Sequence, residues 1–187
     1  LEQRYDEWRS KIRIRNAIMK EEIINKVAKS GLITLNLEDY YQEGERFYFD
    51  IKNLLHEGIV LKEKDFREFI KSYDWSKHKN QYVAIDCSID AIIPIWAYML
   101  ISKSLAPFAK KIVKGSVDLL EKILFDEAIK KIDLEPFSEK NIIIKGCSNK
   151  PVPEYAYVLI TQRLTGVCKK IMYGEACSTV PIYKKWV

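Results

Sequence analysis

The sequence of 187 residues lacks any apolar run long enough to cross a membrane. A membrane helix needs about 20 consecutive apolar residues. The longest run, residues 91–101, is roughly half that length and contains Pro94. Motifs of nucleotide binding are also missing, since neither a Walker A sequence nor GxGxxG occurs. The first residues have no apolar stretch of the kind found in secretory signals. These absences exclude a membrane span and favour a location in the cytoplasm.

Cysteine and histidine are scarce, with four and two residues in the whole chain. In a cytoplasmic protein, four cysteines are more typical of thiols or metal ligands than of disulfides. The two histidines, His56 and His78, both lie in the first half of the chain and show no metal-ligand spacing, so no Cys–His nucleophile pair is visible. There is also no CxxC pair. A cysteine site would therefore have to be assembled from residues that are distant in the sequence.

The composition is that of a globular protein, with 48% hydrophobic and 30% charged residues. The net charge is +5, but Lys and Arg alternate with Asp and Glu along most of the chain. A nucleic-acid-binding protein would show a clustered basic stripe, so no nucleic acid is an expected partner. Residues 1–18 are basic and are predicted to be an N-terminal extension. Residues 19–187 are predicted to form a single α/β domain.

The first part of this domain, residues 19–80, is predicted to be a small α+β segment. Apolar spacing indicates a helix over residues 20–29. Alternating apolar residues over 32–37 and 46–51 indicate two strands joined by a turn, which together predict a hairpin. A second amphipathic helix is expected over residues 63–73.

The second part, residues 81–187, alternates short apolar strands with amphipathic helices. This pattern is typical of β-α-β units, in which helices pack on a mostly parallel sheet. The predicted strands are 82–86, 110–114, 141–145 and 169–173, and the predicted helices are 94–106, 117–132 and 153–165.

Residues 87–115 and 147–174 align with each other. Twelve aligned positions are identical, where ordinary composition would give about two. Both segments begin with Cys-Ser and contain Pro, Ala-Tyr, Leu-Ile, Lys-Lys-Ile and Gly at matching places. We interpret the two segments as an internal repeat, in which each copy is one β-α-β unit.

A pseudo-two-fold arrangement of the two units gives the strand order 2-1-3-4, with strand 82–86 beside strand 141–145. In such sheets, ligands bind outside the carboxyl ends of the strands where the order reverses. Cys87 and Cys147 come directly after these two strands, and the pair Cys177-Ser178 comes after the last predicted strand. The sequence therefore predicts that three cysteines meet at one crevice.

Three thiolates that converge repel one another unless a cation lies among them. The cysteines therefore predict a metal site for zinc or an iron–sulfur cluster, with Cys87, Cys147 and Cys177 as ligands. The residues predicted to surround these ligands or to hold an anion are Ser88, Ser148, Ser178, Asp86 and Asp90.

Two further kinds of aligned residue are assigned to packing. Cys168 aligns with Ala109, so it is expected to fill a small apolar position and not to bind metal. Tyr98 aligns with Tyr157. Their phenols could face the crevice, although packing in the core is favoured for both.

Five segments of the chain are similar to a known family. They are Gly31-Leu-Ile-Thr, Glu63-Lys-Asp-Phe-Arg-Glu-Phe-Ile, Trp96-Ala-Tyr-Met-Leu, Lys145-Gly-Cys-Ser and Met172-Tyr-Gly-Glu-Ala-Cys-Ser-Thr-Val-Pro. Over about residues 20–185 the chain resembles the bacterial domain of unknown function 2480 family. Cys87, Cys147 and Cys177 fall on cysteines of the family pattern, whereas Cys168 does not. Members are often encoded beside iron–sulfur cluster assembly genes. The resemblance thus implies a role near cluster assembly, with assembly proteins as partners.

The expected function is that of a cytoplasmic metal- or iron–sulfur-binding accessory protein, and whether it is an enzyme stays open. One alternative is an enzyme that uses a cysteine thiolate to accept persulfide sulfur. Another is a non-catalytic interaction module with structural cysteines, in which the edge of strand 46–51 pairs with a second subunit. No membrane partner is expected, and a homo-oligomer is left open.

Overall fold

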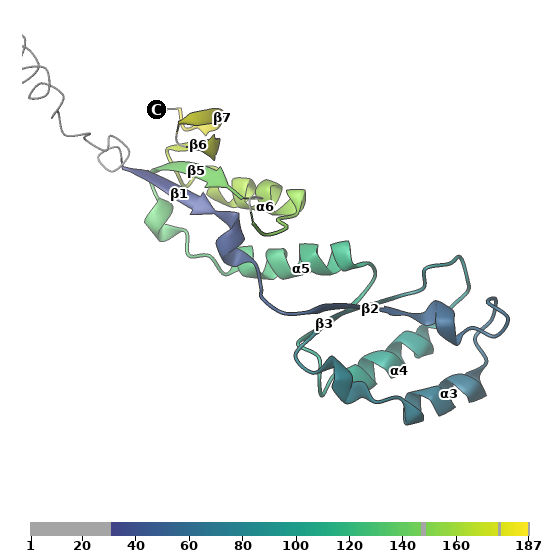
Figure 1. Cartoon of the computed structure of the whole chain (residues 1–187). Helices are drawn as coiled ribbons and strands as arrows, with labels where there is room; N and C mark the ends of the chain where they lie inside the picture. Colours follow the sequence, from purple (N-terminus) through teal and green to yellow (C-terminus); the bar gives the residue numbers. More distant parts are fainter. Residues whose placement is uncertain (1–30, 147–148, 176, 187) are drawn as a thin grey trace, which may run out of the picture.

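The computed structural model describes residues 31–146, 149–175 and 177–186. In this part of the chain the strands form two sheets (Figure 1). Sheet A has the order β1-β5-β6-β7, and sheet B has the order β2-β3-β4. The two sheets lie toward opposite ends of an elongated molecule, and helix α5 runs between them. No helix within the described ranges is both long enough and apolar enough to cross a membrane.

All pairings are parallel except that of β7, which runs antiparallel to β6. The strands of sheet A are β1 (Leu32–Asn36), β5 (Asn141–Lys145), β6 (Lys170–Glu175) and β7 (Ser178–Lys184). Those of sheet B are β2 (Arg46–Asp50), β3 (Tyr82–Asp86) and β4 (Lys111–Lys114). The α-helices are α3 (Glu63–Ser72), α4 (Ile95–Leu105), α5 (Val117–Lys130) and α6 (Glu154–Leu164). Four short 3-10 helices are η1 (Leu37–Tyr40), η2 (Ile51–Leu54), η3 (Trp75–His78) and η4 (Glu135–Phe137).

The two aligned segments of the sequence form the same succession of elements. In sheet B, β3 leads through the 11-residue helix α4 to the parallel strand β4. In sheet A, β5 leads through the 11-residue helix α6 to the parallel strand β6. Each central strand also pairs on its other side with a strand from the N-terminal part of the chain, β2 in one case and β1 in the other. The elements of the two sheets therefore correspond one to one, apart from β7.

The correspondence extends to the short helices η1 and η2, which come directly after the edge strands. Asn36 ends β1 and Asp50 ends β2, and the side chain of each accepts a hydrogen bond from the backbone amide two residues further on. Both cap residues have φ −90° and ψ 114°. Asn and Asp are favoured at such caps because their short side chains reach the unpaired amides of the first turn. The caps direct the next residues, Leu37 and Ile51, into the two cores, where both are fully buried.

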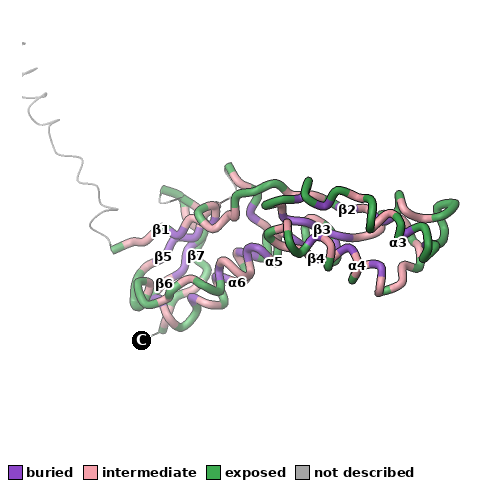
Figure 2. Tube along the Cα trace, turned by 90° about the horizontal axis from the view of Figure 1, so that it is seen from below, coloured by how far each residue is buried: buried purple, intermediate pink, exposed green. Residues whose placement is uncertain are grey.

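Buried residues concentrate around the two sheets and along α5 (Figure 2). Helices α3 and α4 contribute to the core of sheet B, and α6 contributes to that of sheet A. Helix α5 serves both sheets. Leu120 and Leu124 pack against sheet B, whereas Phe125 and Ile129 belong to the core of sheet A. The spacing of four residues within each pair places its members on one face of the helix. This helix therefore joins the two halves through apolar contacts.

The structure confirms the mixed α/β class, but the predicted hairpin is wrong. β1 and β2 lie in different sheets, and each runs parallel to the strand beside it. The single order 2-1-3-4 is not found either. β3 has β2 and β4 as neighbours, while β5 has β1 and β6, so β3 does not lie beside β5. Alternating apolar residues are typical of an edge strand in a parallel sheet as well as of a strand in a hairpin. The pattern therefore does not distinguish the two arrangements.

The two sheets diverge after their second aligned strand. Gly115 after β4 and Gly174 near the end of β6 have φ of +138° and +119°, which favour glycine. Beyond Gly115, the side chain of Ser116 caps the start of α5 by accepting the amide of Leu119. Beyond Gly174, the chain instead returns as β7 along the outer edge of β6. Sheet A thus has a fourth strand that the sequence pattern did not reveal.

Candidate functional site

Of the three cysteines predicted to bind metal, the two that the structure describes lie in different sheets. Cys87 lies after β3 in sheet B and is half-buried, while Cys177 and Ser178 are exposed where β7 begins in sheet A. Cys147 and Ser148 lie outside the described residues. Among the residues that are described, no group of three His, Cys, Asp or Glu side chains could hold a metal ion. The predicted metal or iron–sulfur function is therefore wrong. Its premise fails because β3 and β5 end in different sheets and share no crevice.

Two of the polar residues predicted to surround that site, Asp86 and Ser88, have local partners. Asp86 accepts a hydrogen bond from the next backbone amide at 2.9 Å, and its carboxylate lies 3.3 Å from the Lys114 ammonium. The amide of Ser88 donates to the Asp50 carboxylate at 3.0 Å. Asp90 is exposed. The carboxylates at the end of sheet B therefore bind backbone amides and a lysine of the same chain.

Cys168 is fully buried in the core of sheet A, as its alignment with Ala109 predicts. Its thiol donates to the Leu164 carbonyl with a sulfur–oxygen distance of 3.2 Å. Burial raises the pKa of this thiol above its usual range. Cys168 is thus a protonated packing residue.

Two cavities lie at corresponding places, each between a helix and the sheet that it covers. Pocket A has a volume of about 460 Å³, and pocket B has a volume of about 750 Å³. Pocket A is lined by Ile144, Val152, Glu154, Tyr157, Thr161, Tyr173 and Ile182. Pocket B is lined by Ile85, Ile95, Tyr98, Met99, Ser102, Lys103, Ala106, Ile112 and Lys114. Both contain an isoleucine at the fourth position of the central strand, Ile85 of β3 or Ile144 of β5, and a tyrosine and a hydroxyl residue at aligned positions of the helix.

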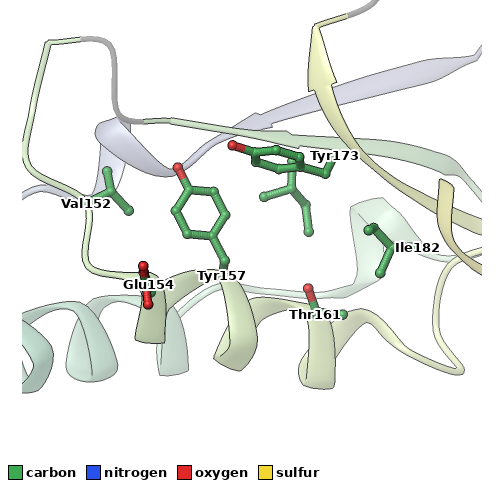
Figure 3. Close-up of a pocket in the computed structure, with 7 residues that line it drawn as sticks. Val152, Glu154, Tyr157, Thr161, Tyr173 and Ile182 are labelled. Atoms are coloured by element: carbon green, nitrogen blue, oxygen red, sulfur yellow. The ribbon is translucent and has the colours of Figure 1, made fainter. Parts of the chain in front are cut away.

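Pocket A is walled on one side by β7 (Figure 3). Tyr157 points from α6 toward the sheet, where its ring meets that of Tyr173. The two ring centroids are 5.7 Å apart and the rings are nearly perpendicular, at 81°. Ile182 of β7 lies at the far side of the cavity from Glu154. The added strand thus supplies an apolar side chain that narrows this pocket.

Pocket B has a lysine where pocket A has a neutral residue. Lys114 takes the place of Tyr173, and its ammonium lies 5.5 Å from the centroid of the Tyr98 ring. Burial raises the pKa of Tyr98. Lys114 opposes this rise, while Asp86 adds to it. The phenol is therefore neutral at physiological pH and can donate a hydrogen bond into the pocket. Lys103 adds a second ammonium at the rim.

Two of the residues that line pocket B are apolar and exposed. Ile95 and Met99 are 78% and 65% exposed. In the described part of sheet B, β4 has β3 on one side and no strand on the other. We call this region the open side of sheet B and define it as pocket B and the outer edge of β4. It combines a cavity, apolar side chains and unpaired backbone groups.

Sequence reasoning noted Tyr98 and Tyr157 but missed the residues that distinguish the two pockets. A signal for them was present. Residues 91–117 contain four lysines and no acidic residue, in a chain where the two signs otherwise alternate. Without the structure, nothing indicated that β4 lacks an outer neighbour.

Comparison with known proteins identifies a family but no activity. A family model described as "Protein of unknown function (DUF2480)" matches residues 21–185. This match confirms the resemblance seen in the sequence. No curated protein and no solved structure matches the chain.

Proposed function

This chain belongs to the DUF2480 family, and because that description assigns no activity, we propose from the geometry that it is a non-enzymatic protein-interaction module. Its binding surface is the open side of sheet B. One observation carries the proposal. β7 covers the edge of β6 and walls pocket A, whereas the corresponding edge of β4 and pocket B are left open.

The exposed apolar side chains support this surface. A folded protein exposes single apolar residues everywhere, but a contiguous group beside a cavity is typical of a site for another protein. Ile95 and Met99 lie one turn apart on α4, and both line pocket B. The position in α6 that aligns with Ile95 is occupied by Glu154. At this aligned position the open side of sheet B is thus apolar where sheet A carries a charge.

A thiolate enzyme has less support. A reactive cysteine is typically placed beside Lys, Arg or a protonated His, which stabilises the thiolate. The residue directly before Cys87 is the acidic Asp86. Its carboxylate forms an ion pair with the nearby Lys114. Cys168 is buried and protonated, and Cys177 is exposed on a turn. No described cysteine has the surroundings that this chemistry needs.

A matched pair of substitutions tests the proposed surface. Met99 and Val158 are aligned in α4 and α6 and are 65% and 57% exposed. The tagged full chain, expressed in the cells that naturally produce it, is expected to migrate on native gels above the size of the 21.9 kDa monomer. Met99→Glu should return it to the monomer position, because a charge buried in an apolar contact makes the free energy of binding less favourable by about 2–4 kcal/mol. Val158→Glu should leave the complex intact.

Three outcomes would contradict the proposal. The wild-type chain could migrate as a monomer, both variants could dissociate the complex equally, or Met99→Glu could have no effect. Thermal unfolding of the two purified variants controls for misfolding, since both replacements are at exposed helix positions and should leave stability almost unchanged.

A further inference from the structure

We propose that the partner binds as an extended acidic segment of another protein, which adds to β4 as an antiparallel strand and places an apolar side chain in pocket B. This inference rests on the proposed function, because it specifies how the same surface recognises its partner. Strand addition is an established mode of peptide recognition, in which backbone hydrogen bonds give affinity and side-chain pockets give specificity.

Sheet A contains the geometry that sheet B is expected to adopt. β7 runs antiparallel to β6, with Tyr183 opposite Ile171 and Val180 opposite Tyr173. Between them, Ile182 reaches pocket A. β4 aligns with β6 in sequence and holds the same place beside the central strand. A strand that pairs with β4 in the same register would therefore direct its residue corresponding to Ile182 into pocket B.

The outer edge of β4 has backbone groups that such a strand could bind. An edge strand presents alternate N–H and C=O groups that have no partner within the sheet. β4 pairs with β3 along Lys111–Lys114, and the described residues provide no strand on its other side. Pocket B, with a volume of about 750 Å³ against about 460 Å³ for pocket A, has room for an additional apolar side chain.

The charge of the edge favours an acidic partner. Lys110, Lys111 and Lys114 lie on or next to β4, and Lys103 lines pocket B from α4. Lys111 pairs with Glu127 and Lys114 with Asp86. Lys103 has no ion pair within the described ranges, and the Lys110 ammonium contacts the Glu43 carbonyl at 3.4 Å and lies 5.3 Å from the centroid of the Tyr82 ring. Neither lysine is paired with a carboxylate of the described residues, so both can pair with carboxylates of an incoming strand.

The same lysines argue against a second copy of this chain. If two β4 strands paired antiparallel about a two-fold axis between Ile112 and Val113, Lys111 of each would face Lys114 of the other. Like charges directly opposite each other destabilise a pair of strands. Lysines on an exposed edge are also a common device against self-association. The expected occupant is therefore a different chain.

The sequence of β7 provides a defined probe. The peptide has the sequence of residues 177–186 with C177S, K184E and K185E. In sheet A, Lys184 lies opposite Lys170, and the Lys185 amide bonds to the Lys169 carbonyl. The two glutamates would thus face Lys111 and Lys110, which align with Lys170 and Lys169. The matched control peptide carries C177S alone and keeps both lysines.

Binding is measured on the full chain by NMR titration and amide hydrogen exchange. The acidic peptide is expected to bind with a Kd of about 1 mM or tighter and to slow exchange of β4 amides. The lysine peptide should bind roughly tenfold more weakly, and added salt should reduce the difference. In the protein, Lys103→Glu should weaken binding, while Gln162→Glu at the aligned position in α6 should not.

Several results would overturn strand addition. They are no binding of the acidic peptide up to about 1 mM, equal binding of both peptides, slowed exchange in β6 without β4, or a dimer of the chain alone by sedimentation. If Met99→Glu dissociates the native complex while the peptide fails to bind β4, only strand addition is wrong. If Met99→Glu has no effect as well, the proposed function also fails.

Discussion

Sheet A and sheet B contain the same succession of strand, helix and strand, yet one is closed by a further strand and the other is not. The difference arises at two aligned glycines. Gly174 leads through a turn into β7, whereas Gly115 leads into Ser116, which caps helix α5. A change in local turn and cap residues thus determines whether the sheet edge is paired. It also determines which of the two pockets has a further strand along its side.

The segment that follows β4 forms helix α5, which joins the two halves of the molecule. It therefore does not form a strand along the outer edge of β4. Adjacent residues on this helix belong to different cores. Leu124 packs with Leu120 against sheet B, and Phe125 packs in the core of sheet A. The two halves can therefore be perturbed separately by substitutions one residue apart.

The largest expected effect comes from this pair. Phe125→Ala should lower the free energy of unfolding by about 3–5 kcal/mol, and Leu124→Ala by about 2–5 kcal/mol, because both side chains are almost fully buried. Amide hydrogen exchange should show where the loss falls. Phe125→Ala should speed exchange in β5 more than in β3, and Leu124→Ala should do the reverse.

Equal acceleration in both sheets for both variants would show that the two halves unfold as one cooperative unit. It would contradict the view that α5 carries two separable contacts. Leu119→Ala serves as the control, because Leu119 lies on the same helix, is 40% exposed and should change the free energy of unfolding much less.

A smaller effect is expected from exchanging two aligned residues of the pockets. Tyr173→Lys should destabilise the protein by about 1–2 kcal/mol, since it removes the ring contact with Tyr157 and buried apolar area. Lys114→Tyr should change stability by less than about 1 kcal/mol, because the exposed ion pair with Asp86 that it removes contributes little. Urea unfolding measures both. Similar losses for the two would show that the pockets do not differ as described.

Much of the fold could be predicted from the sequence, because apolar periodicity reports on local structure. The strands 82–86 and 141–145 have the predicted bounds, and the four described α-helices lie within two residues of theirs. What failed was pairing. The apolar pattern of β3 and β5 shows that each is a buried central strand, but it carries no information on which strands flank it. β5 pairs with β1, which is the first strand of the described chain and far from β5 in the sequence, and no local signal indicates that choice.

The candidate site was harder to predict for the same reason. The cysteines were predicted to be metal ligands because of their residue type, and the prediction that they converge depended on a strand order that is wrong. The open side of sheet B depends instead on a missing neighbour of β4 among the described residues, which is a property of the whole topology. Met99 and Lys103 carry no motif, and their significance appears only beside a free edge and a cavity.

Another small effect is expected from the caps that end β1 and β2. Asn36→Ala and Asp50→Ala should each cost about 1 kcal/mol at neutral pH, because each removes the hydrogen bond that begins a 3-10 helix. Asp50→Ala should lower the free energy of unfolding more than Asn36→Ala does, since the Asp50 carboxylate also accepts a hydrogen bond from the Ser88 amide. Urea unfolding at pH 7 should resolve this order.

Only one of these caps titrates. Partial burial disfavours the charged form of Asp50, but hydrogen bonds from Ser88 and from the Lys52 amide outweigh it and lower its pKa. A carboxyl with a lower pKa in the folded than in the unfolded state stabilises the fold above its unfolded pKa, about 4. That contribution is lost as the pH falls through the folded value.

The contributions of the two caps to the free energy of unfolding should therefore differ at acidic pH. Asp50→Asn should flatten the fall in stability below about pH 4, and Asn36→Ala should leave its shape unchanged. Parallel curves for wild type and Asp50→Asn would show that the charge of Asp50 contributes nothing beyond a neutral cap, and that the ends of β1 and β2 are equivalent.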